Sequence, residues 1–431
     1  MMQSPPAPSD TVYCRSRMAN GLRLITAPMP LARSVAISVY VGAGSRYERS
    51  EEAGISHFVE HLCFKGTAKR PTAQLISEAI DGVGGILNAA TDREYTVFYA
   101  KVARPHLELA LDVLCDLVRA PLFDAAELEK ERKVVLEELA SVADSPGQQV
   151  DLLLDELLWP GQPLGWDIAG TKESIEGLTR EMVVDYVRRQ YVPNNMVVAV
   201  AGAVDEAELA GLLAPTLASM ASGTPAAWFP AQDGQEEPRC SLRFKRTEQT
   251  HIALGLRGLP LEHPDRYALD LLSVLFGESM SSRLFLELRE RQGLCYDVHS
   301  YVTHFLDAGS FGVYAAVDPA NGSKAVAALM GELRRLAEGV PEDELRKAKE
   351  LAKGRMLLRM EDTRAVSGWL GGQEMLTGEV QTPEDVVARL EAVTPPDLAR
   401  VVDGFLRRDA LKLAVVGPHR SERRFLPLLE L

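Results

Sequence analysis

The side chains best suited to chemistry lie together near the N-terminus, in the run from Gly54 to Thr67. If this run is helical, His57 and His61 lie one turn apart and their imidazoles leave the same face. Glu60 shares that face, whereas apolar residues such as Phe58 occupy the other sides and would bury the helix. Two imidazoles and a carboxylate that point from a buried helix toward one place need a common partner. A divalent metal ion satisfies all three.

The spacing His57-x-x-Glu60-His61 is the inverted form of a zinc-protease signature. With eight histidines in 431 residues, a chance occurrence stays an alternative: surface histidines, or core histidines bonded to carbonyl groups. A mononuclear iron site built from two histidines and one carboxylate is a further alternative. In the zinc-protease signature the glutamate of the helix is not a ligand, and such a helix has no place in that iron chemistry.

The length and the charge of the chain limit the classes of protein to which it can belong. A chain of 431 residues is too long for one ordinary core, so two or more domains are expected. The net charge of −14 argues against nucleic acid and against anionic membrane surfaces as partners, and no basic patch in the sequence offsets it. No run of about 18 apolar residues predicts a membrane span.

The cysteines and the first residues indicate a compartment. The five cysteines are scattered, odd in number and without C-x-x-C spacing, which is typical of reduced thiols; they are Cys14, Cys63, Cys115, Cys240 and Cys295. The opening segment 1–10 lacks an apolar signal core and an arginine-rich transit pattern. We expect an intracellular, cytoplasmic location; a leader that has been removed stays an open alternative.

The elements that must position these side chains follow from periodicity. Strands are expected at 21–26, 34–42, 85–100 and 195–202, and helices at 73–83, 106–119, 150–158 and 180–191. Within 85–100, Asn88, Thr91 and Glu94 are placed where a strand could present its edge, although a half-exposed strand without further role explains them equally well. Another helix is expected from Asp124 through Leu139, opened by an acidic capping pattern.

Two carboxylates of that long helix share a face. Glu131 and Glu138 are seven residues apart, which is two helical turns, whereas Glu137 points elsewhere. The sequence also predicts an internal repeat of about 215 residues. The counterparts are 191–202 with 405–417, and 123–130 with 340–349. Two similarly folded halves are therefore expected: 1–221, a proline-rich and glycine-rich linker at 222–239, and 240–431.

The repeat predicts that only one half holds a metal. In its register, Glu131 and Glu138 fall on Ala348 and Arg355. The segment 267–277, the counterpart of the histidine helix, contains no histidine. The second half therefore lacks the ligand set.

Taken together, these residues resemble the pitrilysin-type zinc peptidases, family M16, particularly the short bacterial members and the β subunit of the mitochondrial processing peptidase. The resemblance covers nearly the whole chain. It rests on the duplicated halves and on three blocks: His57-x-x-Glu60-His61, Glu131-Arg-x-x-Val-x-x-Glu138, and Arg289-Glu-Arg-Gln-Gly-Leu-Cys-Tyr296. It implies an α+β fold in which each half is a mostly antiparallel sheet flanked by helices.

The resemblance also implies the metal site. His57, His61 and Glu138 would ligate one Zn²⁺ per chain, with Glu137 as the third ligand if the register is off by one. Glu131 would be the carboxylate that orients a ligand histidine. Its alternative is a solvated glutamate on a helix face.

The remaining roles follow the same resemblance. Glu60 would be the general base on a zinc-bound water. Arg289 and Tyr296, from the opposite half, would reach the substrate carbonyl and the oxyanion, although they could simply pack at a helix end. Asn88 and Ala89 would belong to an edge strand that binds extended peptide by its main chain, so broad specificity is expected.

The function implied is that of a zinc metalloendopeptidase that cleaves peptides or unfolded segments inside a closed chamber. Because full-length relatives enclose that chamber with four such repeats and this chain has two, a homodimer or a related partner chain is expected. Nucleic acid and membranes are not expected partners. The alternative function is a non-catalytic structural or partner subunit of an M16-type assembly, in which ligands are usually lost.

Overall fold

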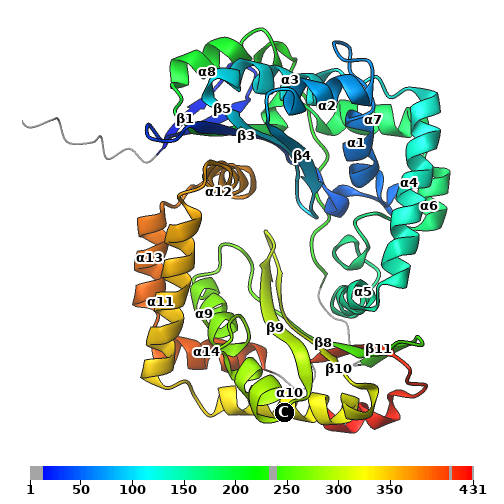
Figure 1. Cartoon of the computed structure of the whole chain (residues 1–431), viewed down its shortest axis with the longest axis vertical. Helices are drawn as coiled ribbons and strands as arrows, with labels where there is room; N and C mark the ends of the chain where they lie inside the picture. The colour runs from blue at the N-terminus through cyan, green and yellow to red at the C-terminus, as the bar shows by residue number, and fades with distance from the viewer. Residues whose placement is uncertain (1–12, 233–239, 407–409, 430–431) are drawn as a thin grey trace, which may run out of the picture.

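The first half of the chain is built around one six-stranded sheet with the order β1-β2-β6-β3-β5-β4 (Figure 1). The computed structural model describes residues 13–232, 240–406 and 410–429. The strands are β1 (Cys14–Arg17), β2 (Arg23–Pro28), β3 (Ser34–Val41), β4 (Ile86–Thr91), β5 (Thr96–Ala103) and β6 (Met196–Gly202). The helices are α1 (Ile55–Cys63), α2 (Ala73–Asp81), α3 (Leu107–Arg119), α4 (Ala125–Asp144), α5 (Pro146–Leu158), α6 (Lys172–Gly177), α7 (Arg180–Gln190) and α8 (Glu206–Leu213).

The second half has a five-stranded sheet with the order β7-β11-β8-β10-β9. Its strands are β7 (Cys240–Phe244), β8 (Thr250–Arg257), β9 (Cys295–His304), β10 (Gly309–Val317) and β11 (Lys412–Gly417). Its helices are α9 (Arg266–Phe276), α10 (Gly322–Ala337), α11 (Glu342–Arg359), α12 (Thr363–Leu376), α13 (Pro383–Ala392) and α14 (Pro395–Phe405). A π-helical segment, η7 (Phe285–Arg291), precedes β9.

The two sheets have the same topology, which confirms the expected α+β fold of two homologous halves. The order β2-β6-β3-β5-β4 of the first sheet matches β7-β11-β8-β10-β9 of the second, and β1 is an addition. In both sheets the first of these pairs, β2 with β6 and β7 with β11, is parallel, and the remaining pairs are antiparallel.

One helix of each half packs on the sheet of the other half. Helix α5 packs on β8 and β11, and α12 packs on β2, β3 and β6 (Figure 1). Glycines permit the close approach: a Cβ at Gly371 would lie 2.4 Å from a ring carbon of Tyr40, and one at Gly255 would lie 2.9 Å from Leu154. Each half has its own main apolar core on one face of its sheet, and the helix from the other half covers the opposite face.

Several element boundaries differ from the sequence-based expectation. The segment 85–100 is a hairpin of β4 and β5 joined by a turn, not one strand. Glu94 lies in that turn and is buried, so its expected place at an exposed strand edge is wrong. Helix α4 runs on to Asp144, and the Asp124 side chain accepts hydrogen bonds from two backbone N–H groups at its start.

A buried arginine explains why Glu94 turns inward. The Arg46 guanidinium is fully buried and makes ion pairs with Glu94 of the first half and Asp307 of the second. It also stacks on Trp228, at 4.3 Å from the ring centroid, and its Nε donates to the carbonyl oxygen of Phe229. Glu94 in turn accepts from the Leu306 N–H. This junction joins both halves to the linker.

The linker is therefore held in place over its described part. The Phe229 N–H donates to the Arg46 carbonyl at 3.1 Å, and the Ala231 N–H donates to Asp307 at 2.8 Å. Residues 233–239, which contain the acidic residues of the expected linker, are outside the described residues.

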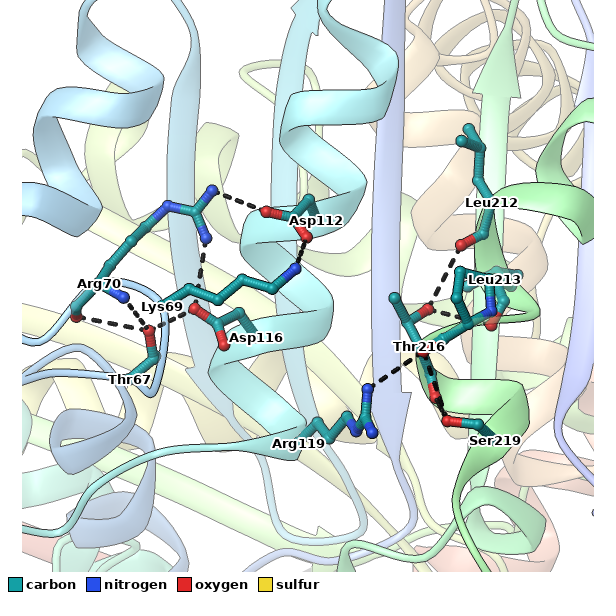
Figure 2. Close-up of polar contacts among 11 residues, drawn as sticks. Thr67, Lys69, Arg70, Asp112, Asp116, Arg119, Leu212, Leu213, Thr216 and Ser219 are labelled. Atoms are coloured by element: carbon teal, nitrogen blue, oxygen red, sulfur yellow. Dashed lines mark hydrogen bonds and ion pairs between the residues drawn. The ribbon is translucent and has the colours of Figure 1, made fainter.

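Polar contacts fix the loop that follows α1 (Figure 2). Thr67 and Arg70 in this loop bind Asp116 of helix α3, and Arg70 also pairs with Asp112 at 2.8 Å. Further along the same helix, Arg119 donates to the carbonyl oxygen of Pro215, after α8. The C-terminal end of α1 is thereby tied to the helix layer behind the first sheet. Among the helices that the structure describes, none combines the length and apolarity that crossing a bilayer requires.

The junction around Arg46 gives a prediction about stability. Replacing Arg46 with methionine leaves the Glu94 carboxylate buried without its cation, and such a loss costs about 3–5 kcal/mol of the free energy of unfolding. Urea unfolding of Arg46→Met measures it. The control is Arg49→Met, an exposed arginine three residues away, with an expected change below about 0.5 kcal/mol. Equal stability of the two variants would contradict the prediction.

Candidate metal centre

Two packed helices bring three metal-ligating side chains together. His57 and His61 lie on α1 and Glu138 lies on α4, and these helices are in contact. The two Nε2 atoms are 3.1 Å apart, and Glu138 Oε2 lies 3.8 Å from Nε2 of His57 and 3.6 Å from Nε2 of His61. Within the described chain, this is the group of histidines, cysteines and carboxylates close enough to share one ion.

The spacing of these three atoms fits zinc. Tetrahedral zinc with ligand distances near 2.0–2.1 Å places its ligand atoms about 3.3 Å apart, and the three observed separations lie on either side of that value. The donor set of two imidazoles and one carboxylate is also that of catalytic zinc sites, which keep a fourth position for water or substrate. Glu137 is exposed and takes no part in the group, so the structure brings Glu138 rather than Glu137 to the histidines.

Glu131 holds His61 from behind. Its Oε1 lies 2.9 Å from His61 Nδ1, and its Oε2 pairs with Lys65 at 2.6 Å. Burial alone would raise the pKa of Glu131, but the hydrogen bonds from His61 and Lys65 outweigh it and the pKa is lowered. An ionised Glu131 accepts the Nδ1 proton of His61, which leaves the Nε2 lone pair free for a metal. The alternative of a solvated glutamate does not describe this buried residue.

His57 has a different environment. Burial, and secondarily the neighbouring His61, lower the pKa of His57 to about 4. For His61, burial acts in the same direction, but the hydrogen bond to Glu131 and the charge of Glu138 outweigh it and raise the pKa. A neutral imidazole is the form that binds metal, so His57 is in the ligating state at neutral pH. In the part of the chain described, its buried Nδ1 has no hydrogen-bond partner.

Glu60 lies beside the two histidines on α1, and Thr91 orients it. The Thr91 hydroxyl, at the end of strand β4, donates a hydrogen bond to Glu60 Oε2. Burial raises the pKa of Glu60, and the Thr91 hydrogen bond offsets this only in part. A carboxylate with a raised pKa beside a metal site is suited to accept a proton and to return it.

A second buried carboxylate fixes the start of α1. Both oxygens of Glu48 accept backbone hydrogen bonds, from Gly54 at 2.7 Å and from Ser56 at 2.8 Å. The Ser56 hydroxyl also pairs with the Tyr186 hydroxyl at 2.7 Å. Gly54 has φ 91°, a conformation that favours glycine and lets the chain enter the helix at this point. The first turn of α1, which carries His57, is therefore anchored on two sides.

Asn88 and Ala89 lie on β4, which forms the edge of the first sheet next to α1. Asn88 is exposed, and its Oδ1 accepts from the Ala89 N–H. One side of β4 pairs with β5, and the other side has no strand partner in the described sheet. This free edge can accept an extended peptide as a further strand.

Arg289 and Tyr296 are close to each other but not to the metal ligands. The Arg289 Nη1 donates to the Tyr296 carbonyl at 3.0 Å, and its guanidinium lies 4.4 Å from the centroid of the Tyr296 ring. Tyr296 is 77% exposed at the start of β9, the edge strand of the second sheet. No contact found among the described residues connects this pair to His57, His61 or Glu138.

The equivalent place in the second half holds an ion pair. Helices α9 and α11 pack together as α1 and α4 do. Ala348 is buried, and Arg355 pairs with Glu278 at 3.2 Å and donates to its carbonyl oxygen at 2.6 Å. Among the described residues at this place, histidines, cysteines and carboxylates do not gather within reach of one ion.

Three supporting residues were missed by sequence reasoning. Lys65 lies four residues after His61, so helical spacing could have placed it beside Glu131. Thr91 is expected from the sequence only at a strand edge, and Glu48 is given no role. Neither position carries a local signal for its contact, because the partner lies elsewhere in the chain.

Models of known families match most of the chain. Residues 23–172 match the family described as insulinase, peptidase family M16, and residues 177–351 match the family described as the peptidase M16 inactive domain. The fold agrees with solved structures. A protease from Helicobacter pylori superposes with a TM-score of 0.86 at 24% identity, covering 94% of this chain and 99% of that one. A chain of complex III2 from Candida albicans superposes with a TM-score of 0.83 at 20% identity, covering 97% and 100%.

Relatives of similar length resemble the chain from end to end. It is 36% identical over 416 residues to an uncharacterized zinc protease of Streptomyces coelicolor, a match that covers 95% of this chain and 90% of that protein. It is 35% identical over 416 residues to an uncharacterized zinc protease of Bacillus subtilis, covering 93% and 97%. The chain therefore belongs to peptidase family M16, as one of its short members.

Proposed function

We propose that the chain is a zinc-dependent metalloendopeptidase that hydrolyses peptides or unfolded segments inside a closed chamber. The observation that carries the proposal is the convergence of His57, His61 and Glu138, with Glu60 beside them on the same helix. Three ligands that leave a fourth position open are typical of catalytic rather than structural zinc. One Zn²⁺ per chain is proposed, because the second half has an arginine where the first has its carboxylate ligand.

Residues around the metal site have separate roles in the proposed reaction. A zinc ion held at this site would polarise a scissile carbonyl and lower the pKa of a water molecule. Glu60 is the proton carrier: Thr91 occupies its Oε2, so Oε1 takes a proton from water and passes it to the leaving amine. Glu131 keeps the Nδ1 proton on His61. This holds the imidazole in one tautomer and one orientation throughout the reaction.

Substrate contacts come from both halves in this proposal. The main chain at Asn88 and Ala89 binds an extended peptide along β4. Arg289 and Tyr296 donate hydrogen bonds to the substrate carbonyl and to the oxyanion that develops from it. The contact between these two residues supports their acting as a pair. Because α5 and α12 are exchanged between the sheets, we propose that neither half works alone.

The assembly and the location are further parts of the proposal. We propose a homodimer, or a pair with a related chain, because this chain supplies two of the four halves that enclose a full-length chamber. All five cysteines are free, which supports a cytoplasmic location. The proposed domain division is 1–221, 222–239 and 240–431, because β6 completes the first sheet before the linker and the two described sheets share no strand.

The second candidate is a non-catalytic structural or partner subunit. The observation that favours it is the fold shared with a chain of complex III2. The ligand group around His57 argues for the enzyme, because a purely structural subunit has no need to keep two imidazoles and a carboxylate within reach of one ion.

Replacing Glu60 with glutamine tests the proposed reaction. Glutamine keeps the shape and the Thr91 contact but cannot accept a proton, so the rate of peptide cleavage falls by roughly 10²- to 10⁴-fold. Bound zinc stays at the wild-type level. Mass spectrometry of products from a peptide mixture and metal analysis of the same samples measure both effects.

The control for this variant is Glu137→Gln, an exposed carboxylate one residue from a ligand, which should leave cleavage unchanged. Identical product profiles from wild type and Glu60→Gln would end the peptidase proposal. Absence of both metal and cleavage in the wild type would favour the structural subunit.

Replacing Glu131 with glutamine tests the support behind the metal site. An amide no longer holds the Nδ1 proton of His61 with a charge, so zinc affinity is expected to fall by about 10- to 100-fold. Competition with a chelator of known affinity measures the change. Glu129→Gln, an exposed glutamate on the same helix, is the matched control. Unchanged affinity in Glu131→Gln would mean that this carboxylate has no role in the site.

Replacing Tyr296 with phenylalanine tests the contribution of the second half. Loss of one donor to a developing oxyanion lowers kcat by about 10²- to 10³-fold, with KM and bound zinc little changed. Steady-state kinetics on one defined peptide separates the two constants. A variant with normal kcat would show that Tyr296 only packs against Arg289.

A further inference from the structure

A cationic pocket lies at the far end of the free edge strand from the metal centre. The pocket has a volume of about 520 Å³, and its lining includes Ile86, Tyr99, Lys101, Arg359, Asp362 and Arg364. Three of these side chains are cations and one is an anion, in a chain whose net charge is −14. The cations come from β5, the end of α11 and the start of α12, so both halves build the pocket.

The pocket lies on one face of the first sheet, and alternate residues of strand β4 project toward that face. In the β4–β5 register, Ile86 pairs with Lys101 and Asn88 pairs with Tyr99. The residues between them, Leu87 and Ala100, pack into the main core on the other face. Ile86 is 59% exposed and forms the lip of the pocket. A peptide added to the edge of β4 would therefore pass directly beside these cations.

The three cations are not equally neutralised. Lys101 pairs with Asp362 at 2.6 Å. The Arg364 guanidinium lies over the Tyr99 ring, 3.5 Å from its centroid, and no acidic partner for it is found in the described chain. Arg359 is exposed, and no hydrogen bond or ion pair of its side chain is found there either. Two positive charges thus remain without an anion at a site that an extended peptide would reach.

The length of β4 between the pocket and the metal centre determines how many peptide residues would separate the two. Thr91, at the other end of β4, touches Glu60, and Ile86 is five residues away along the strand. At about 3.4 Å per residue, this separation is about 17 Å. An added strand follows β4 residue by residue, so a group in the pocket would lie about five residues from the bond beside Glu60.

We propose that this pocket binds a carboxylate of the peptide substrate about five residues from the scissile bond. The inference rests on the proposed peptidase function and adds a preference to it: the edge strand reads the main chain without regard to sequence, and the pocket selects an anionic group at one distance. Guanidinium groups bind carboxylates by paired charge-assisted hydrogen bonds. The carboxylate belongs to an acidic side chain or to the C-terminus of a short peptide.

The test scans one glutamate through an otherwise neutral peptide and maps each cut by mass spectrometry. The cut bond is expected to move with the glutamate at a constant spacing of about five residues. Cleavage should be about tenfold faster than that of the matched glutamine peptide. Peptides with a free or an amidated C-terminus distinguish the two sources of the carboxylate.

Two variants assign the effect to the pocket. Arg359→Gln should abolish the spacing and the preference while neutral peptides are still cut at the wild-type rate. Arg346→Gln removes the same charge from an exposed position on the same helix and should retain both. Cuts that ignore the position of the glutamate, or equal effects of the two variants, would overturn the proposal.

A binding measurement separates this proposal from the peptidase function. Fluorescence anisotropy with Glu60→Gln protein compares the glutamate and glutamine peptides without turnover. About tenfold tighter binding of the glutamate peptide, lost in the added Arg359→Gln change, supports the pocket even if no peptide is cut. Equal binding of the two peptides would overturn the pocket whether or not the enzyme cleaves.

Discussion

The structure depends on one constraint: helix α1 is buried by its apolar side and carries two imidazoles and a carboxylate that must each find a partner. Burial disfavours charge on all of them. Glu131, itself kept ionised by Lys65, binds the rear of His61. Thr91 binds Glu60, and Glu48 fixes the start of the helix. These contacts leave the two Nε2 atoms and the Glu138 carboxylate facing one another. A metal ion bound between them would be their common partner.

The two homologous halves contain two versions of this arrangement, and in the described chain only the first brings a metal-binding group together. Helices α9 and α11 repeat the packing of α1 and α4, but Arg355 and Glu278 occupy the place of the metal group. An ion pair neutralises itself, so this half is stable without an ion. The halves still depend on each other, because α5 and α12 cover the opposite sheets and the Arg46 junction joins them.

The two parts of the proposed substrate site, strand β4 and the cationic pocket, differ in how they discriminate between peptides. Strand β4 offers backbone groups, which every peptide can match, so it contributes affinity and alignment. Charged side chains at its far end, Arg359 and Arg364, can distinguish one peptide from another because only an anion compensates them. A broad peptidase can in this way acquire a preference without changing its metal centre or its edge strand.

Much of the fold and of the candidate metal site could be predicted from the sequence, because the patterns that predict them are local. The i, i+4 spacing of His57 and His61, the two-turn spacing of Glu131 and Glu138, and the repeat of helix and strand patterns all follow from regular periods. These periods predict the ligand candidates, the two halves and a second half without the ligand set. The inward turn of Glu94, the carboxylate of Glu48 at the start of α1 and the cationic pocket were decided only by tertiary structure. In each case the partners lie in different segments, and no local pattern encodes which distant charges the fold brings together.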